Sequence, residues 1–205
     1  MTSLAPKYSD SVFLNCPFDE KHEPIRQAMI FAIYDCGFAP RCALEIDDGS
    51  DVRINKIVNL IRVSKFGIHD LCRTELDHAT RLPRFNMPLE LGIFLAAKSF
   101  GSAEQKKKSC LILDSEQYRY QTFISDIAGH DIRSHKNSPE HAITHVRNWL
   151  SNASGRDSLP GGLAIIERYS EFRRDLGKMC KELDLDKAEL TYRDFSNLVT
   201  AWLTA

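Results

Sequence analysis

The chain has 205 residues, of which 43% are hydrophobic and 27% charged, and this composition suits one globular domain with a small appendage. The net charge of −1 argues against a nucleic acid as direct ligand, and no apolar run is long enough to span a membrane. The first residues lack the features of a signal peptide, and the six cysteines include no Cys-x-x-Cys pair. We therefore expect a cytoplasmic protein with reduced thiols and with neither disulfides nor a zinc site.

Short apolar strands alternate with amphipathic helices over the first three quarters of the chain. Strands are expected at residues 11–14, 38–43, 65–71 and 110–113, and a last short helix and strand within 124–132. Helices are expected between Asp19 and Gly37, over 54–61, from Pro88 onward and over 139–150. The pattern predicts an α/β fold with a five-stranded, mostly parallel sheet, ordered around its first strand and covered by helices on both faces.

The C-terminal part of the chain has a different pattern. Residues 151–155 have the composition of a linker, and the residues beyond them are helical by periodicity. Two apolar stripes, which include Ile165 and Phe195, need to be covered by other protein surface. We therefore expect an α/β domain at residues 8–150 and a small helical appendage at residues 156–205, which packs on the core or makes an oligomer contact.

Polar side chains follow the expected strands at the edge of the sheet where the strands end. Ligands of open parallel sheets bind beyond this carboxyl edge, so the convergence predicts a small-molecule site. Structural alternatives remain open, because Asn15 and Asp19 could cap the next helix, Asp70 could bind loop amides and Arg73 could pair with Glu75. The residues of this edge are Asn15, Asp19, Arg41, Asp70, Arg73 and Asp114.

A further carboxylate, Glu90, lies near the start of a strongly apolar helix within residues 84–97. Pro88 suits a first helical turn, where no backbone donor is needed. The helix dipole favours an ionised carboxylate at this position, and such a group can act as a nucleophile or stabilise a developing cation. The alternative is that Glu90 only caps its helix.

Motifs that would name a common cofactor are missing from the sequence. No G-x-G-x-x-G follows the first strand, and there is neither a Walker A loop nor a G-x-S-x-G elbow. His69 lies in an expected strand and is interpreted as a packed histidine. His141 and His145 share a helix face without a third metal ligand nearby, which indicates a solvated face, and the three lysines at 106–108 predict an exposed turn.

Three motifs in this order resemble nucleoside 2-deoxyribosyltransferase-like proteins, relatives of the TIR-type NAD hydrolases that are often found in bacterial defence. They are Phe-Leu-Asn-Cys-Pro-Phe at residues 13–18, Ile-His-Asp-Leu at 68–71 and Glu-Leu-Gly at 90–92. The resemblance covers residues 11–134 and implies a flavodoxin-like fold. It also implies that Glu90 attacks or stabilises the anomeric carbon of a nucleoside and that Asp70 contacts the sugar or the base.

The resemblance extends to groups that would hold the substrate. Phe18 stands where the family has an aromatic residue near the end of the first strand, and Asn86 opens a segment where the transferases have a small pair. Asn15 would help to hold the ribose hydroxyls, and Arg41 or Arg73 a phosphate. No metal and no cofactor are expected.

The function expected from the sequence is N-glycosidase activity on a nucleotide or NAD, through an oxocarbenium stabilised by a carboxylate. A competing expectation is a non-enzymatic nucleotide sensor, whose helical C-terminal part passes the ligand state to a partner. A third is an interaction module without ligand. Expected partners are the small nucleotide itself and a second copy of the chain or a protein of a defence system.

Overall fold

The computed structural model of the chain describes residues 6–46, 48–74, 76 and 81–205. Five strands form one sheet in the order β2-β1-β3-β4-β5, and each neighbouring pair is parallel. The predicted parallel sheet is confirmed, with its first strand between the second and the third. The strands are β1 Ser11–Asn15, β2 Ala39–Arg41, β3 Phe66–Asp70, β4 Ser109–Asp114 and β5 Ile132–Ser134.

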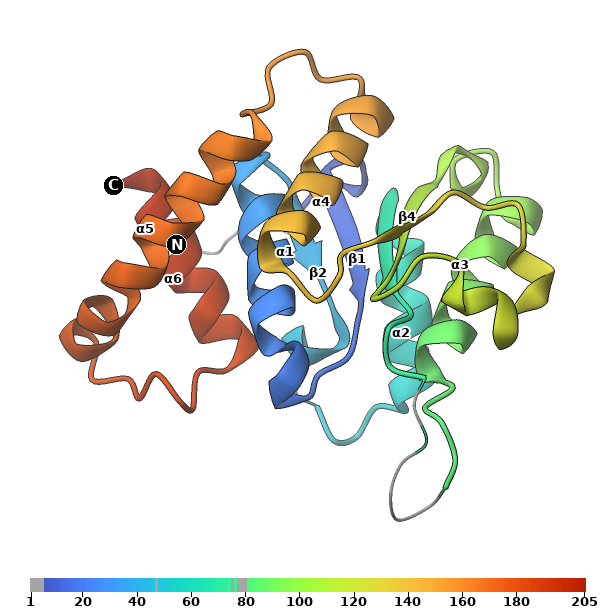
Figure 1. Ribbon diagram of the computed structural model, residues 1–205, viewed down its shortest axis with the longest axis horizontal. Helices are drawn as coiled ribbons and strands as arrows, with labels where there is room; N and C mark the ends of the chain where they lie inside the picture. The colour runs from blue at the N-terminus through green and yellow to red at the C-terminus, as the bar shows by residue number, and fades with distance from the viewer. Residues whose placement is uncertain (1–5, 47, 75, 77–80) are drawn as a thin grey trace.

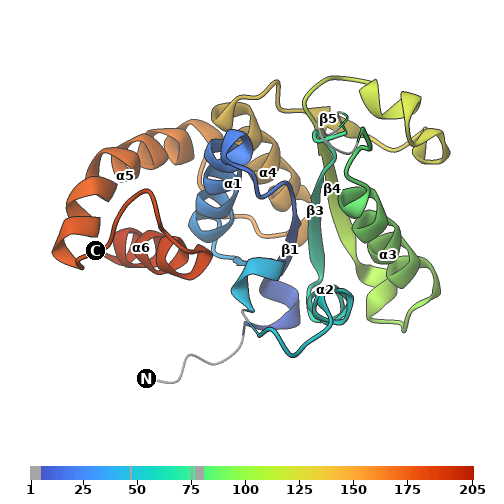
Figure 2. The ribbon, with the colours of Figure 1, turned by 90° about the horizontal axis from the view of Figure 1, so that it is seen from below.

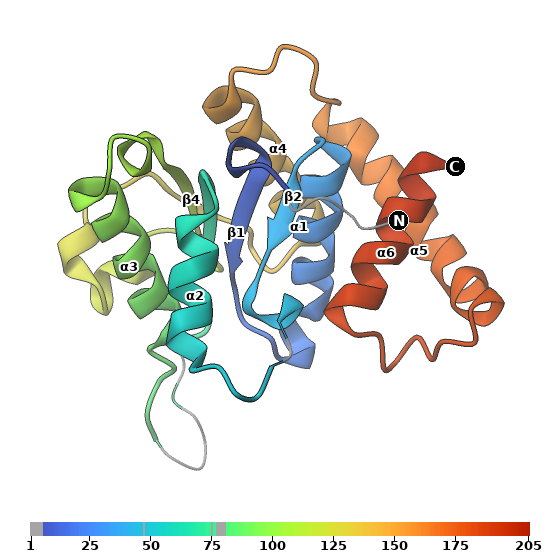
Figure 3. The ribbon, with the colours of Figure 1, turned by 180° about the vertical axis from the view of Figure 1, so that it is seen from behind.

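Helices cover both faces of this sheet. α1 and α4 lie on one face, α2 and α3 lie on the other, and α5 and α6 lie outside α1 (Figures 1 and 2). Figure 3 shows the molecule from behind, with α2 toward the viewer. Strand order and helical layers are those of a flavodoxin-like fold, as expected. The helices are α1 Glu23–Asp35, α2 Arg53–Arg62, α3 Asn86–Phe100, α4 Pro139–Ser154, α5 Gly162–Glu182 and α6 Tyr192–Thr204.

Successive strand residues point to opposite faces of the sheet, and this alternation decides where each side chain of the edge lies. On β1, Val12 belongs to the core under α1 and α4, whereas Phe13 packs with α2 and α3. On β3, Ile68 faces α1 and α4. The next residue, His69, points to the other face, where its ring packs edge-on against Phe94 of α3 at a centroid distance of 5.0 Å. His69 is fully buried, so the interpretation as a packed histidine is confirmed.

The C-terminal helices share the main hydrophobic core. The rings of Phe172 in α5 and Trp202 in α6 lie 5.4 and 5.9 Å from the ring of Phe31 in α1, measured between centroids. The longest helix, α5, has 21 residues. Among the residues that the structure describes, no helix is both long enough and apolar enough to cross a bilayer. The ring contacts between α1, α5 and α6 mean that the apolar stripes of α5 and α6 are covered by α1 and by each other.

The segment expected as a linker is instead the last turn of α4. This helix runs to Ser154 and ends at Gly155, whose φ of 67° lies in the left-handed region that glycine adopts without strain. Ala153 packs against the main core and Leu150 is fully buried. Packing of the apolar side of α4 against the core thus extends the helix through residues 151–154, most of which have a weak intrinsic helix propensity.

The lysine-rich turn at 106–108 is exposed only in part, contrary to the expectation. Lys108 is buried, and its Nζ donates hydrogen bonds to the carbonyl oxygens of Ile61 and Ser64 at the end of α2. A lysine there satisfies carbonyl groups that the end of a helix leaves without partners. The expected solvated face of α4 also differs, because His145 is half-buried with Nε2 3.0 Å from the carbonyl oxygen of Ser134.

Candidate functional site

The buried carboxylate of Glu90 lies on the α3 side of the carboxyl edge. It shares one helix face with Met87, Leu91 and Phe94, and this spacing turns all four toward the sheet. The side chain is only 8% exposed. Burial raises the pKa of the Glu90 carboxyl from 4.5 to about 7, and the charge of Arg53 opposes this rise. The helix dipole favours the ionised form, as expected from the sequence, but the loss of solvation on burial opposes it.

Asn15 fixes the start of α3 to the end of β1. Its side-chain amide donates to the carbonyl oxygen of Met87 over 2.9 Å and to Nδ1 of His69 over 3.1 Å. The side chain is buried, so both bonds form away from water. Asn86, the first residue of α3, is exposed beside this anchor. Asn15 thus positions the helix that carries Glu90.

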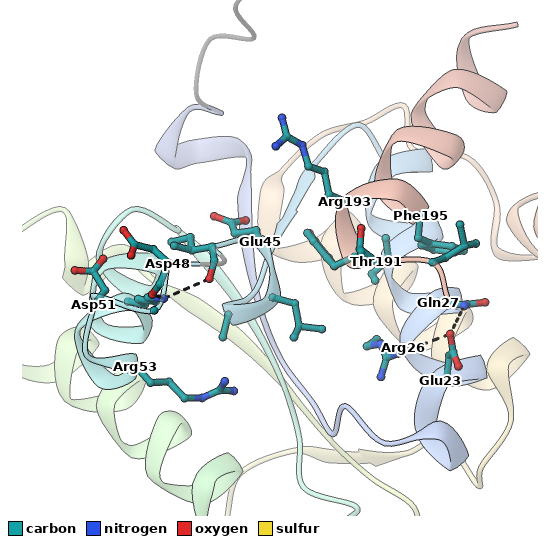
Figure 4. Close-up of a pocket in the computed structure, with 18 residues that line it drawn as sticks. Glu23, Arg26, Gln27, Glu45, Asp48, Asp51, Arg53, Thr191, Arg193 and Phe195 are labelled. Atoms are coloured by element: carbon teal, nitrogen blue, oxygen red, sulfur yellow. Dashed lines mark hydrogen bonds and ion pairs between the residues drawn. The ribbon is translucent and has the colours of Figure 1, made fainter. Parts of the chain in front are cut away.

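An aromatic ring and two guanidinium groups lie together near the end of β1. The guanidinium carbons of Arg26 and Arg53 lie 5.9 and 6.0 Å from the centroid of the Phe18 ring. Arg26 belongs to α1 and Arg53 is the first residue of α2, and Figure 4 shows both side chains extending toward the space between these helices. Two cations beside one partly exposed ring can bind an anionic ligand that carries a flat ring.

A cavity of about 880 Å³ opens at this edge between α1, α2 and α6 (Figure 4). Arg26 of α1 and Arg53 of α2 line this cavity, together with Thr191 and Arg193 at the start of α6. Glu90 is not among the residues that line the cavity. Arg53 does line it, and the positive charge of Arg53 lowers the pKa of the Glu90 carboxyl. The volume lies within the range of roughly 300 to 1,000 Å³ that is usual for small-molecule sites.

Asp70 lies on the other face of the edge, as the alternation along β3 requires. Its carboxylate is fully buried, with Oδ2 at 3.1 Å from Nε2 of His22 and at 3.2 Å from Nε2 of His135. Oδ1 accepts a hydrogen bond from the backbone N–H of Cys72. Burial alone would raise the pKa of Asp70, but the close imidazoles of His135 and His22 hold it well below its usual range. The carboxylate is thus occupied by two imidazoles and has no exposed atom for a sugar.

The two arginines expected to hold a phosphate are both paired with carboxylates. Arg41 donates from Nε and Nη2 to Glu45, with distances of 2.6 to 3.0 Å. Arg73 donates to both carboxylate oxygens of Asp19 over 2.7 and 2.9 Å. The alternative partner of Arg73, Glu75, lies outside the described residues. In this arrangement the two guanidinium groups support loops of the edge, whereas Arg26, Arg53, Lys56 and Arg193 are cations that line the cavity. Of these, Arg26 also lies 3.9 Å from the carboxylate of Glu23.

Asp19 and Asp114 also have structural partners. Asp19 accepts from the backbone N–H of His22 at the start of a short 3-10 helix, as the capping alternative predicts. Asp114 is fully buried and accepts from Nε and Nη2 of Arg119 over 3.0 and 2.5 Å. Arg119 also donates to the carbonyl oxygen of Leu71. These contacts join the ends of β3 and β4 and form no part of the cavity.

Sequence reasoning missed four members of the edge. Arg26 and Arg53 lie in the first turns of helices that begin at this edge. This position was a usable signal because ligands of open parallel sheets bind in the crevice where these helices start. His22 and His135 carried no such signal, since each meets Asp70 only across a long sequence separation.

Neither the protein-family models nor the curated proteins compared with this chain match it. The chemistry of the site is therefore inferred from its own geometry.

Proposed function

We propose that the protein cleaves the N-glycosidic bond of a nucleotide or of NAD, with Glu90 as the carboxylate at the anomeric carbon. The C–N bond breaks with its electron pair leaving on the base, and the carboxylate stabilises or captures the cationic sugar until water adds. The observation that carries the proposal is a nearly buried carboxyl whose pKa is raised to about 7 by burial and lowered by the charge of Arg53, a residue that lines the cavity. The motif resemblance supports the same reaction class.

The environment of Glu90 suits this role. A poorly solvated carboxylate interacts strongly with a positive charge that develops beside it, because little water is present to weaken the interaction. Arg53 favours the ionised form, so that a substantial fraction of the carboxyl is ionised near neutral pH. Asn15 holds the start of α3 and thereby the position of Glu90 at the edge.

Phe18, Arg26 and Arg53 are proposed to hold the rest of the substrate. The ring can stack on a base or a sugar face, and the two guanidinium groups can bind phosphate oxygens through paired hydrogen bonds. Asp70 is assigned no substrate contact, since its carboxylate is buried against two histidines. All six cysteines are free thiols, which supports a cytoplasmic location.

A nucleotide sensor is a second candidate, favoured by one contact of the C-terminal part. Tyr192, at the first turn of α6, lines the cavity and donates from its hydroxyl to the carbonyl oxygen of Pro40 over 2.7 Å. A ligand in the cavity would therefore contact both the sheet edge and α6. In this alternative the ligand shifts α6 and a partner protein, of a defence system or a second copy, responds to the shift.

The deciding experiment measures base release from nucleosides, nucleotides and NAD by the full-length protein, its Glu90→Gln variant and a Glu171→Gln control. Glu171 is an exposed glutamate of α5 that does not line the cavity. We expect Glu90→Gln to slow release by roughly a hundredfold or more with substrate binding retained, and the control to match the wild type. Release by the Glu90→Gln variant at the wild-type rate refutes the catalytic role. Tight nucleotide binding without any release supports the sensor instead.

A further inference from the structure

A buried cluster on the opposite face of the sheet has the composition of a metal site. His22, Asp70 and Cys72 each offer one ligand atom, and these atoms lie within 4.8 Å of one another. All three side chains are buried. The thiol of Cys72 is 3.5 Å from Nδ1 of His22, whose Nε2 is 3.1 Å from Asp70. Nitrogen, oxygen and sulfur atoms that can each bind a metal thus converge on one small space.

Two polar atoms of this cluster have poor hydrogen bonding for their burial. Nε2 of His22 and Oδ2 of Asp70 lie 3.1 Å apart and are shielded from water, but neither forms a hydrogen bond of good geometry with a described residue. Buried polar atoms without good partners are rare and call for an explanation such as an ion. An ion bound between these two facing atoms would give both of them a partner.

We propose that His22, Asp70 and Cys72 bind one zinc ion. Zinc accepts a mixed set of imidazole, carboxylate and thiolate ligands, whereas calcium and magnesium prefer oxygen alone. A tetrahedral ion with bonds of about 2.0 to 2.3 Å brings its ligand atoms to about 3.3 to 3.6 Å from one another, so side-chain movements of about 1 Å close the site. A fourth position is left for water.

His135 fits the role of an outer partner and not of a fourth ligand. Its Nδ1 accepts a hydrogen bond from the backbone N–H of Asn137 over 3.0 Å, so its hydrogen is on Nε2. Nε2 then donates to Oδ1 of Asp70 over 3.4 Å. Ligating carboxylates are commonly held in this way by a second hydrogen bond that fixes their orientation.

The binding step involves no oxidation. Zinc forms one bond each to a ring nitrogen, a carboxylate oxygen and the sulfur, and the thiol releases its proton to solvent. If the imidazole of His22 is protonated beforehand, its proton is released as well. The site lies across the sheet from Glu90, so zinc is proposed here as a ligand of the fold and does not depend on the proposed reaction.

Cobalt(II) titration of the chelator-treated full-length protein tests the site. A thiolate ligand gives a sulfur-to-cobalt charge-transfer band, and we expect this band to saturate at one cobalt per chain and to vanish when zinc, which binds more tightly, is added. The band should be lost in Cys72→Ser and kept in the matched control Cys110→Ser. Cys110 is the least buried cysteine and the best competitor for adventitious binding.

Several outcomes would overturn the proposal: no charge-transfer band, a band that survives in Cys72→Ser, or a band that is lost in Cys110→Ser. Zinc-edge X-ray absorption of the wild-type protein supplies a second measurement that needs no variant. It should detect one sulfur at about 2.3 Å together with nitrogen or oxygen neighbours. A spectrum without sulfur, or a protein that retains no zinc after gel filtration, rejects the site even if Cys72→Ser fails to fold.

Discussion

Replacing Glu90 by glutamine should stabilise the protein at alkaline pH and have little effect at acidic pH. Burial raises the pKa of this carboxyl from 4.5 to about 7 in the folded state. The folded protein therefore binds more protons than the unfolded chain between these values, so stability falls as pH rises through that window. Below about pH 4.5 both states are protonated and the penalty is absent, whereas above about pH 7 it is complete.

The size of the effect follows from the shift. A change of about 2.5 pKa units corresponds to about 3 kcal/mol, most of which develops between about pH 5 and about pH 8. Glutamine keeps the shape of the side chain and does not titrate. The difference in unfolding free energy between Glu90→Gln and the wild type should thus increase by about 2 to 3 kcal/mol from pH 5 to pH 8, in favour of the variant.

Urea denaturation followed by circular dichroism at several pH values measures this difference. The matched control is Glu171→Gln, because that glutamate is exposed and its difference from the wild type should stay nearly constant with pH. A Glu90→Gln difference that is independent of pH, or that grows toward acidic pH, would refute the assignment of a raised pKa to this carboxyl. The test needs no substrate and stands apart from the proposed reaction.

Three other substitutions have expected outcomes. Arg53→Gln removes the charge that lowers the pKa of Glu90, so the acidic limb of the plot of base-release rate against pH should move to higher pH. A limb that stays in place would contradict the effect of Arg53 on the pKa of Glu90. Asp70→Asn leaves two buried imidazoles without their carboxylate and should cost about 3 to 5 kcal/mol in urea denaturation, and a loss below about 1 kcal/mol would contradict it. Gly67→Ala would place a Cβ 2.7 Å from the ring of Phe94, and thermal unfolding should reveal a loss of about 1 to 3 kcal/mol; unchanged stability would disprove this close contact.

The sequence by itself determined the architecture of this protein. Apolar strands such as residues 110–113 and helices with spaced apolar residues alternate, and a parallel sheet covered on both faces is the arrangement that buries them. The edge that collects polar side chains followed from the same alternation, because parallel strands all end there. His69 could be recognised as a packed residue since it lies inside a buried strand.

Only the tertiary structure decided what the polar side chains of that edge do. Asn15 and Asp70 both end strands, yet they lie on opposite faces and have different partners, Met87 of α3 for one and two histidines for the other. Such pairings join residues far apart in the chain, and no local pattern encodes them. Partners of this kind decide whether a charged group is free or engaged, as Arg73 with Asp19 illustrates.

Burial was the second quantity that the sequence could not supply. The position of Glu90 near the start of its helix favoured an ionised carboxylate, but the face of α3 that it shares with Phe94 packs against the sheet, and loss of water raises the pKa of the Glu90 carboxyl. Lys108 appeared to belong to an exposed basic turn, yet it reaches the carbonyl groups at the end of α2. Solvation and long-range contact depend on how the elements pack together, and this packing arises only when the whole chain has folded.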